Sequence, residues 1–243
     1  MESRLGFALT RRVPDFGRLA RFKNAAVVLL AALLVLPLTL WLLKPMAVPD
    51  LAHGNGAGLK ALNAGWASGQ MIVLVRHVER CDHSRAACLG AADGITDRSR
   101  DVAVGVGAQF EHLGLDRADI YHSPLTRAVQ TAGYMFSDAG SGEDWLFNCK
   151  NTMLRDALAH KVPGRNLILV THSECMAQLE KDLKLPVSSF GYGASLFVSS
   201  ASLVLSRPGL APHSASRPGP AGIARLSALQ GAGSPVSASS HSA

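Results

Sequence analysis

A short apolar run that leads directly into basic residues constrains the fold of this chain more than any other feature. Met71–Val75 contains no polar residue, and Arg76 and His77 follow it at once. A run of this length, rich in aliphatic residues, predicts a strand that is buried on both faces, as in parallel sheets. Ligands of open α/β sheets bind beyond the carboxyl ends of the strands. The run therefore predicts Arg76 and His77 at the functional edge of such a sheet.

The same arrangement recurs later in the chain. Leu167–Val170 is a second buried-strand pattern that is closely followed by His172, and Asp119–Tyr121 predicts a third strand. After this third strand a Ser-Pro turn leads into a helix with Arg127 in its first turn, where the helix dipole favours an anion. Arginine binds phosphate oxygens bidentately and histidine can attack phosphorus, so the pattern indicates a phosphate site. A polar loop that happens to follow a strand is the alternative.

The order and spacing of these segments resemble a known family. Arg76-His77 after a strand, the pattern Ser-Pro-Leu-x-Arg-Ala-x-Gln-Thr-Ala over Ser123–Ala132, and a strand ending in His172 are similar to the histidine phosphatase (phosphoglycerate-mutase-like) superfamily. The likeness covers residues 70–205. Within the superfamily the chain resembles Ais-type lipopolysaccharide core heptose(II)-phosphate phosphatases. The residues that carry this narrower likeness are Arg76–Asp82, Cys88, Leu89, Gly94–Thr96, Cys149, Thr171, His172 and Cys175.

The resemblance implies an α/β fold, a three-layer sandwich with a mostly parallel central sheet. It also implies a phosphatase that uses no metal and no other cofactor. His77 would be the nucleophile, and the resulting phosphohistidine would be hydrolysed by water. The groups that would surround the phosphate are Arg76, Arg80, Arg127 and His172.

Three of these residues also have a structural alternative. Arg80 could form a salt bridge with Glu79 or Asp82 on a solvated loop. Arg127 could be an ordinary charge on a helix surface, and His172 could be a core histidine with satisfied hydrogen bonds.

The general acid that protonates the leaving group is where the chain departs from the family. Asn148 stands where many relatives carry Glu, and Ser173 rather than Asp follows the second histidine. Val78 and Ser99 also replace glycines that are usual in the family, and Val78 is expected to narrow the site. The candidates for the acid are Glu174, Glu143 and Glu79.

Apolar periodicity and turn residues predict the remaining elements. The expected helices are 97–113, 127–136, 151–160 and 173–184, with a further short helix near 59–67, and residues 194–205 suggest a closing hairpin.

The regions outside the domain differ sharply in composition. Residues 1–24 are basic, and residues 25–43 are uncharged and, at about 1.5 Å per residue, long enough for a membrane span. The basic side of a span faces the cytoplasm, so the sequence predicts a signal-anchor with the domain outside the cytoplasm. The resemblance implies that this compartment is the periplasm and that the anchor lies in the inner membrane. A cleaved signal peptide, which would release the domain into the periplasm, and a buried core helix are the alternatives. Residues 44–69 are expected to be a linker, and 206–243, rich in Ser, Ala, Gly and Pro, a disordered tail.

Four cysteines follow the apolar segment. In an exported domain an even number indicates two disulfides, with three possible pairings, among which Cys81 with Cys88 would close a small loop. A zinc site at Cys81, His83 and Cys88 is the alternative, although the spacing fits no standard site well.

Charge and composition narrow the function classes. The formal net charge is +6, but much of it lies before the apolar segment, so nucleic acid is not an expected partner. The expected partners are a phosphorylated glycan or glycolipid and, through the anchor, the membrane. Two further hypotheses are a periplasmic phosphatase for another phosphomonoester and a non-catalytic, membrane-anchored phosphate-binding module.

Overall fold

The computed structural model describes residues 16–42, 48, 50–51, 56–201 and 223–226. Within them six strands form one sheet in the order β3-β2-β4-β1-β5-β6. The strands are β1 (Met71–Arg76), β2 (Ala118–His122), β3 (Ser141–Gly142), β4 (Asn166–Thr171), β5 (Ser195–Ser199) and β6 (Ile223–Leu226). Pairing is parallel from β3 through β2 and β4 to β1, and β5 runs antiparallel to both β1 and β6. This is the predicted mostly parallel sheet.

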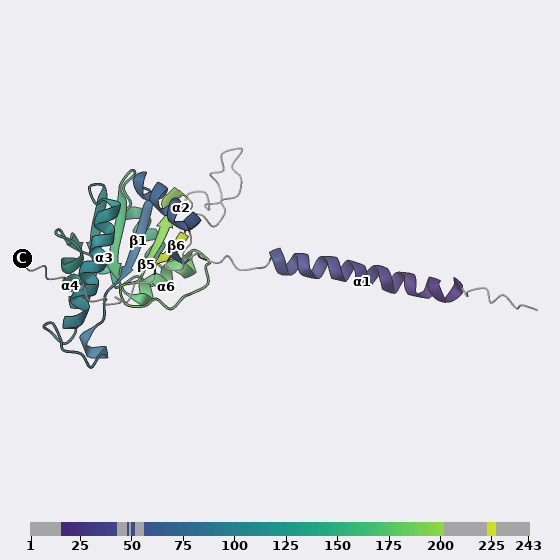
Figure 1. Cartoon of the computed structure of the whole chain (residues 1–243), viewed down its shortest axis with the longest axis horizontal. Helices are drawn as coiled ribbons and strands as arrows, with labels where there is room; N and C mark the ends of the chain where they lie inside the picture. Colours follow the sequence, from purple (N-terminus) through teal and green to yellow (C-terminus); the bar gives the residue numbers. More distant parts are fainter. Residues whose placement is uncertain (1–15, 43–47, 49, 52–55, 202–222, 227–243) are drawn as a thin grey trace, which may run out of the picture. The chain divides into compact units, whose positions relative to one another are not determined.

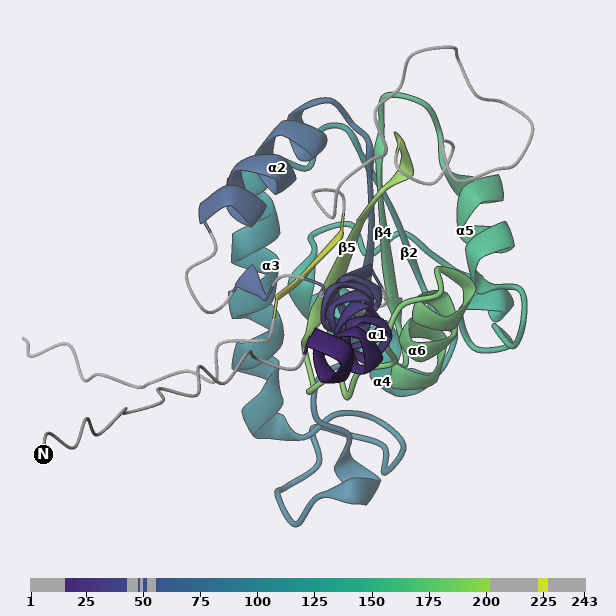
Figure 2. The same cartoon turned by 90° about the vertical axis from the view of Figure 1, so that its right-hand side faces the viewer.

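Helices cover both faces of the sheet (Figures 1 and 2). One face carries α2 (Gly56–Ala67), α3 (Arg100–Leu113) and α4 (Thr126–Met135), and the other carries α5 (Met153–His160) and α6 (Ser173–Asp182). Side chains alternate along a strand, so β1 faces both layers. Val73 and Val75 pack with α2, α3 and α4, whereas Ile72 and Leu74 pack with α5 and α6. The three-layer sandwich is confirmed.

The helix boundaries differ from the expected ones for local reasons. Residues 97–99 form a separate 3-10 turn, η3 (Asp97–Ser99), so α3 begins at Arg100. Asn151 has a φ of 61° and Lys184 a φ of 56°, which no α-helix accommodates, so α5 begins later and α6 ends earlier. Two further 3-10 turns are η2 (Cys81–His83) and η4 (Asp144–Leu146).

The expected linker is wrong for the part that forms α2. Leu62 and Trp66 are buried in the core beside β1 and α3. The indole N–H of Trp66 donates to the carbonyl oxygen of Gly114 at 2.9 Å. The folded domain therefore includes residues from Gly56 onward, because α2 covers apolar surface that would otherwise be exposed. Residues 43–47, 49 and 52–55 lie outside the described part.

The expected closing hairpin is also corrected. β5 forms within residues 194–205. Besides β1, it pairs with β6, with Val198 opposite Ile223 and Ser195 opposite Leu226. These four β6 residues belong to the segment that composition predicts to be disordered. The edge of a sheet exposes unpaired backbone groups. Strand β6 pairs with the edge of β5 that faces away from β1. Residues 202–222 and 227–243, with the rest of the predicted tail, lie outside the described residues.

Helix α1 (Phe16–Leu42) belongs to a separate compact unit, Met1–Pro45. Its segment Ala25–Leu42 has a mean hydropathy of 2.6 over 18 residues. The side chains of Ala25–Leu42 are exposed, and Pro37 lies inside the helix. By length and composition this helix can cross a membrane, a property that it shares with signal sequences. Residues 1–15, most of the predicted cytoplasmic segment, lie outside the described part.

Asn166 offers a test of how α2 is joined to the sheet. Its buried side chain accepts from the Met71 N–H and donates to the Trp66 carbonyl, both at 3.0 Å. Asn166→Ala leaves both backbone groups without these bonds, and we expect the free energy of unfolding to fall by roughly 2 to 4 kcal/mol. Guanidinium unfolding followed by circular dichroism measures this loss. Asn63→Ala, on the exposed side of α2, is the control, and equal effects of the two variants would contradict the role of Asn166.

Candidate active site

The carboxyl ends of β1 and β4 bring the two predicted histidines together. Arg76 pairs with Thr171 in the parallel register, and the backbone N–H of His77 donates to the Thr171 carbonyl at 2.9 Å. The next residue on the β4 side, His172, precedes α6. The two imidazole centroids are 5.2 Å apart. The structure thus joins residues that are nearly a hundred positions apart, at the edge that the strand patterns predict.

His77 is a buried, neutral imidazole. Its Nδ1 lies 2.8 Å from the carbonyl oxygen of Val78, and because a carbonyl only accepts, Nδ1 carries the proton. The pKa of His77 is lowered to about 3, and burial is the largest cause. The hydrogen bond to Val78 opposes this shift, whereas the charges of His172, Arg127 and Arg76 contribute to it. Nε2 is therefore left with its lone pair at neutral pH, which is the state that a nucleophile requires.

His172 is held by a residue that has no role in the sequence-based prediction. Its Nε2 lies 2.8 Å from the hydroxyl of Ser123, which is fully buried after β2. Burial, followed by the positive charge of Arg127, lowers the pKa of His172 to about 4. The signal for Ser123 was available, because it opens the Ser-Pro-Leu-x-Arg motif.

Two arginines present buried donors at the site. Among the described residues, the Nε atoms of Arg76 and Arg127 are buried without a hydrogen-bond partner. The guanidinium of Arg76 lies 4.1 Å above the ring of Tyr192, and its Nη1 donates to the Phe190 carbonyl. Burial, and then the charge of Arg80, lowers the pKa of Arg127. A buried unpaired donor is costly, so an anion that accepts from both groups would be favoured.

Arg80 forms a salt bridge with Asp82, which is one of the structural alternatives given for it above. Its Nε and Nη2 donate to the two carboxylate oxygens of Asp82 at 2.6 and 2.5 Å. Its charge still contributes to lowering the pKa of both Arg127 and His172. The role of Arg80 in phosphate binding thus remains a prediction.

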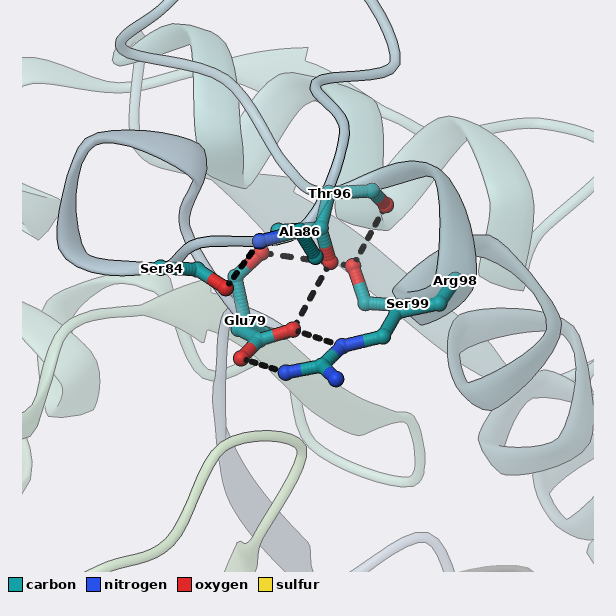
Figure 3. A network of polar contacts seen from close by, with 6 residues as sticks. All are labelled: Glu79, Ser84, Ala86, Thr96, Arg98 and Ser99. Atoms are coloured by element: carbon teal, nitrogen blue, oxygen red, sulfur yellow. Dashed lines mark hydrogen bonds and ion pairs between the residues drawn. The ribbon is translucent and has the colours of Figure 1, made fainter.

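Glu79 is held away from acid chemistry by a network of polar contacts (Figure 3). Arg98 donates to both carboxylate oxygens, at 2.7 and 2.5 Å, and the Thr96 hydroxyl donates at 2.9 Å. The pairing with Arg98 is the largest cause that lowers the pKa of Glu79 to about 2. These contacts oppose protonation of Glu79, and its role as general acid stays a prediction. The hydroxyl of Ser99 donates to the backbone carbonyls of Thr96 and Glu79.

Glu174 is the candidate carboxylate that shares an electrostatic environment with the site. It lies in the first turn of α6, two residues after His172. Partial burial raises its pKa, but hydrogen bonds from its own backbone and Ser173, and the charges of His172 and Arg76, outweigh this and lower it. Glu143 follows β3 and accepts a 3.5 Å bond from Ser141. It is not among the groups that shift the pKa of His77, His172 or Arg127.

Two disulfides brace the loops around this edge. Of the three pairings that the sequence left open, the structure shows Cys81–Cys88, with a Cα–Cα distance of 5.2 Å, and Cys149–Cys175, with one of 5.5 Å. The first bond takes both thiols that the zinc alternative required, so that alternative is wrong here.

Val78 does not narrow the site as expected. Its side chain is fully buried in the core cluster on the α3 and α4 face, and its N–H donates to the Thr131 hydroxyl at 3.2 Å. Tyr192 was missed altogether, because no motif marks it. It reaches the site through the turn before β5, with its ring centroid 5.7 Å from that of His77.

No protein family model matches the chain. Its sequence is 30% identical over 115 residues to the lipopolysaccharide core heptose(II)-phosphate phosphatase of Escherichia fergusonii, covering 46% of this chain and 59% of that protein. It is 32% identical over 116 residues to the protein of the same name from Escherichia coli O1:K1 / APEC, covering 46% of this chain and 57% of that protein. The chain thus spans less than two thirds of the length of these curated relatives. The predicted resemblance to lipopolysaccharide core heptose(II)-phosphate phosphatases is confirmed.

Solved structures show weaker matches. A mycobacterial glucosyl-3-phosphoglycerate phosphatase is 17% identical with a TM-score of 0.42, covering 54% of this chain and 92% of that one. A phosphoserine phosphatase from Entamoeba histolytica is also 17% identical with a TM-score of 0.42, covering 53% of this chain and 89% of that one. Nothing about the activity of this chain follows from these two matches.

The low pKa values of the two histidines predict how stability depends on pH. Both lie below the ordinary value of 6.5, so the unfolded chain binds more protons than the folded protein at acidic pH. The free energy of unfolding is therefore fully retained above about pH 6.5. It falls as the pH drops toward the folded pKa values, by up to about 1.4 kcal/mol per pH unit for each histidine.

Guanidinium unfolding at a series of pH values measures this slope. We expect His77→Gln to reduce the slope between about pH 6.5 and pH 4. His83→Gln, which changes an exposed histidine, should leave it unchanged. If the wild-type protein and His77→Gln lose stability in parallel, His77 is not neutral in the folded protein.

Proposed function

We propose that this chain is a phosphomonoesterase that works through a phosphohistidine at His77. One observation carries the proposal: a neutral imidazole with a free Nε2 lies among Arg76, Arg127 and His172. Nearby positive charge disfavours protonation of a neutral imidazole. The arginines that would bind phosphate therefore also keep Nε2 of the nucleophile unprotonated. The similarity to curated phosphatases supports the same class.

The first chemical step would be an in-line displacement at phosphorus. The Nε2 lone pair of His77 forms the N–P bond while the bond between phosphorus and the ester oxygen breaks. The buried donors of Arg76 and Arg127 would bind the equatorial oxygens, where charge spreads in the transition state. Positive charge is thus supplied by side chains, and we propose a reaction that proceeds without a metal ion.

The leaving alkoxide needs a proton, and Glu174 is our candidate donor. In the free protein its pKa is lowered, so the carboxyl group is ionised. A bound phosphate dianion would add negative charge beside it and raise its pKa, so that substrate binding would itself bring the proton. In the second step water attacks the phosphohistidine, Glu174 accepts a proton from that water, and inorganic phosphate leaves.

The substrate that we propose is a phosphate on heptose of the lipopolysaccharide core. The names of the curated relatives support this choice. Two disulfides are typical of an oxidising compartment, and α1 can cross a membrane by length and composition. Both support a periplasmic domain that is anchored in the inner membrane, or released from it if α1 is cleaved. A phosphatase for another phosphomonoester is the alternative substrate assignment.

A second candidate function is a phosphate-binding module without catalysis. The residue that favours it is Asn148, an amide at the position where the family resemblance leads us to expect the acid. Binding and catalysis use the same arginines, so only turnover distinguishes the two functions.

Phosphate release by the full chain in detergent, with chelator and no added metal, tests the proposal. We expect turnover on phosphorylated lipopolysaccharide core and a loss of about a thousandfold or more in His77→Ala, because the nucleophile is removed. Turnover on a generic phosphomonoester alone would remove the lipopolysaccharide assignment. Folded wild-type protein that binds inorganic phosphate but releases none from either substrate would establish the binding module instead.

The role of Glu174 predicts a specific change in pH dependence. Glu174→Gln should lower kcat by about a hundredfold or more, since the amide cannot donate a proton, and it should remove the loss of wild-type activity at high pH. Glu143→Gln is the matched control and should leave the profile unchanged. A wild-type profile in Glu174→Gln would mean that another group or the substrate supplies the proton.

A further inference from the structure

Phe147 is an aromatic side chain at the site with no role in the proposed chemistry. Its ring centroid lies 5.7 Å from that of His172, and the two rings are inclined at 76°. The side chain is 49% exposed. A single exposed apolar residue is ordinary on a protein surface. Phe147 differs from such a residue because it is fixed beside a histidine of the site.

The segment that carries Phe147 is anchored on both sides. Leu146 is fully buried, and its carbonyl accepts from the Thr171 hydroxyl at 2.6 Å. Two residues after Phe147, Cys149 forms the disulfide with Cys175 of α6. Both anchors reach the junction of β4 and α6, from which His172 extends. An aromatic ring held by such supports is preorganised for a ligand, because little conformational freedom remains to be lost on binding.

The aromatic rings at the site form a row with two different ends. Tyr192 contacts His77, His77 contacts His172, and His172 contacts Phe147, with centroid distances of 5.7, 5.2 and 5.7 Å. At one end Arg76 covers the Tyr192 ring, so that end is positively charged and suits the phosphate. Phe147, an apolar side chain, forms the opposite end of this series of contacts. An apolar ring there suits the group that carries the phosphate.

We propose that Phe147 determines specificity by stacking against the C–H face of a sugar ring whose phosphate reacts at His77. This inference rests on the proposed phosphatase function and names its substrate class as cyclic sugar phosphates. The face of an aromatic ring carries partial negative charge, and the C–H groups of a pyranose present a flat, weakly positive, apolar surface to it. An acyclic phosphomonoester has no comparable face and gains little from Phe147.

Two substrates with equivalent leaving groups test this inference in the full chain. Mannose phosphorylated on its primary hydroxyl supplies a pyranose, and glycerol phosphate is an acyclic ester of a primary alcohol. We expect Phe147→Ala to lower kcat/KM for the mannose ester about tenfold, mainly through KM, and to change that for glycerol phosphate by less than about twofold. Phe147→Trp, which keeps an aromatic face, should retain activity on the mannose ester.

Leu59→Ala is the control, since Leu59 is 51% exposed on α2, outside the site. It should affect neither substrate. Equal losses on both substrates in Phe147→Ala, or no loss on either, would overturn the inference while leaving the phosphatase intact. If the wild-type protein hydrolyses neither ester nor the lipopolysaccharide core, the proposed function fails and the inference fails with it. Thermal melting of each variant separates these outcomes from unfolding.

Discussion

The hydrogen bond between the Nδ1–H of His77 and the Val78 carbonyl is the interaction on which the site depends. It fixes which imidazole nitrogen carries the proton, and burial beside Arg76 and Arg127 keeps the ring neutral. The acceptor is itself immobilised, because the Val78 side chain lies in the core and its N–H bonds to Thr131 of α4. Core packing therefore affects the proposed chemistry directly. The position of the Val78 carbonyl, which the core fixes, determines which nitrogen of His77 carries the proton.

The rest of the site is a balance of charges that the fold distributes among its loops. Positive groups gather at the carboxyl ends of β1 and β4, where burial makes their unpaired donors costly. The carboxylates near this edge of the sheet differ in their partners. Asp82 accepts hydrogen bonds from Arg80 and Glu79 from Arg98, whereas Glu174 lies within the electrostatic environment of His172. This division separates Glu174, our proposed proton donor, from Asp82 and Glu79, whose carboxylates are paired with arginines.

Much of this architecture could be predicted from sequence, for a physical reason. β1 and β4 are buried on both faces, so their apolar runs are uninterrupted and their ends are marked by polar residues. Strand β6 could not be predicted, because four residues that pair by their backbone at a sheet edge need no apolar pattern. The position of Tyr192 beside His77 could not be predicted either, and neither could the choice of Asp82 as the partner of Arg80. Both depend on the conformations of loops. Ser123 lay within a motif, but only the structure shows that its hydroxyl meets His172.

The protonation state of His77 is the central claim, and the nitrogen chemical shifts of its imidazole ring test it most directly. The full chain, labelled at histidine and compared with His77→Gln for assignment, would be examined by NMR at about pH 5, where an ordinary exposed histidine is charged. A neutral ring with the proton on Nδ1 is the predicted result. An imidazolium, or a neutral ring with the proton on Nε2, would leave no lone pair on Nε2 to attack phosphorus and would contradict the proposed mechanism.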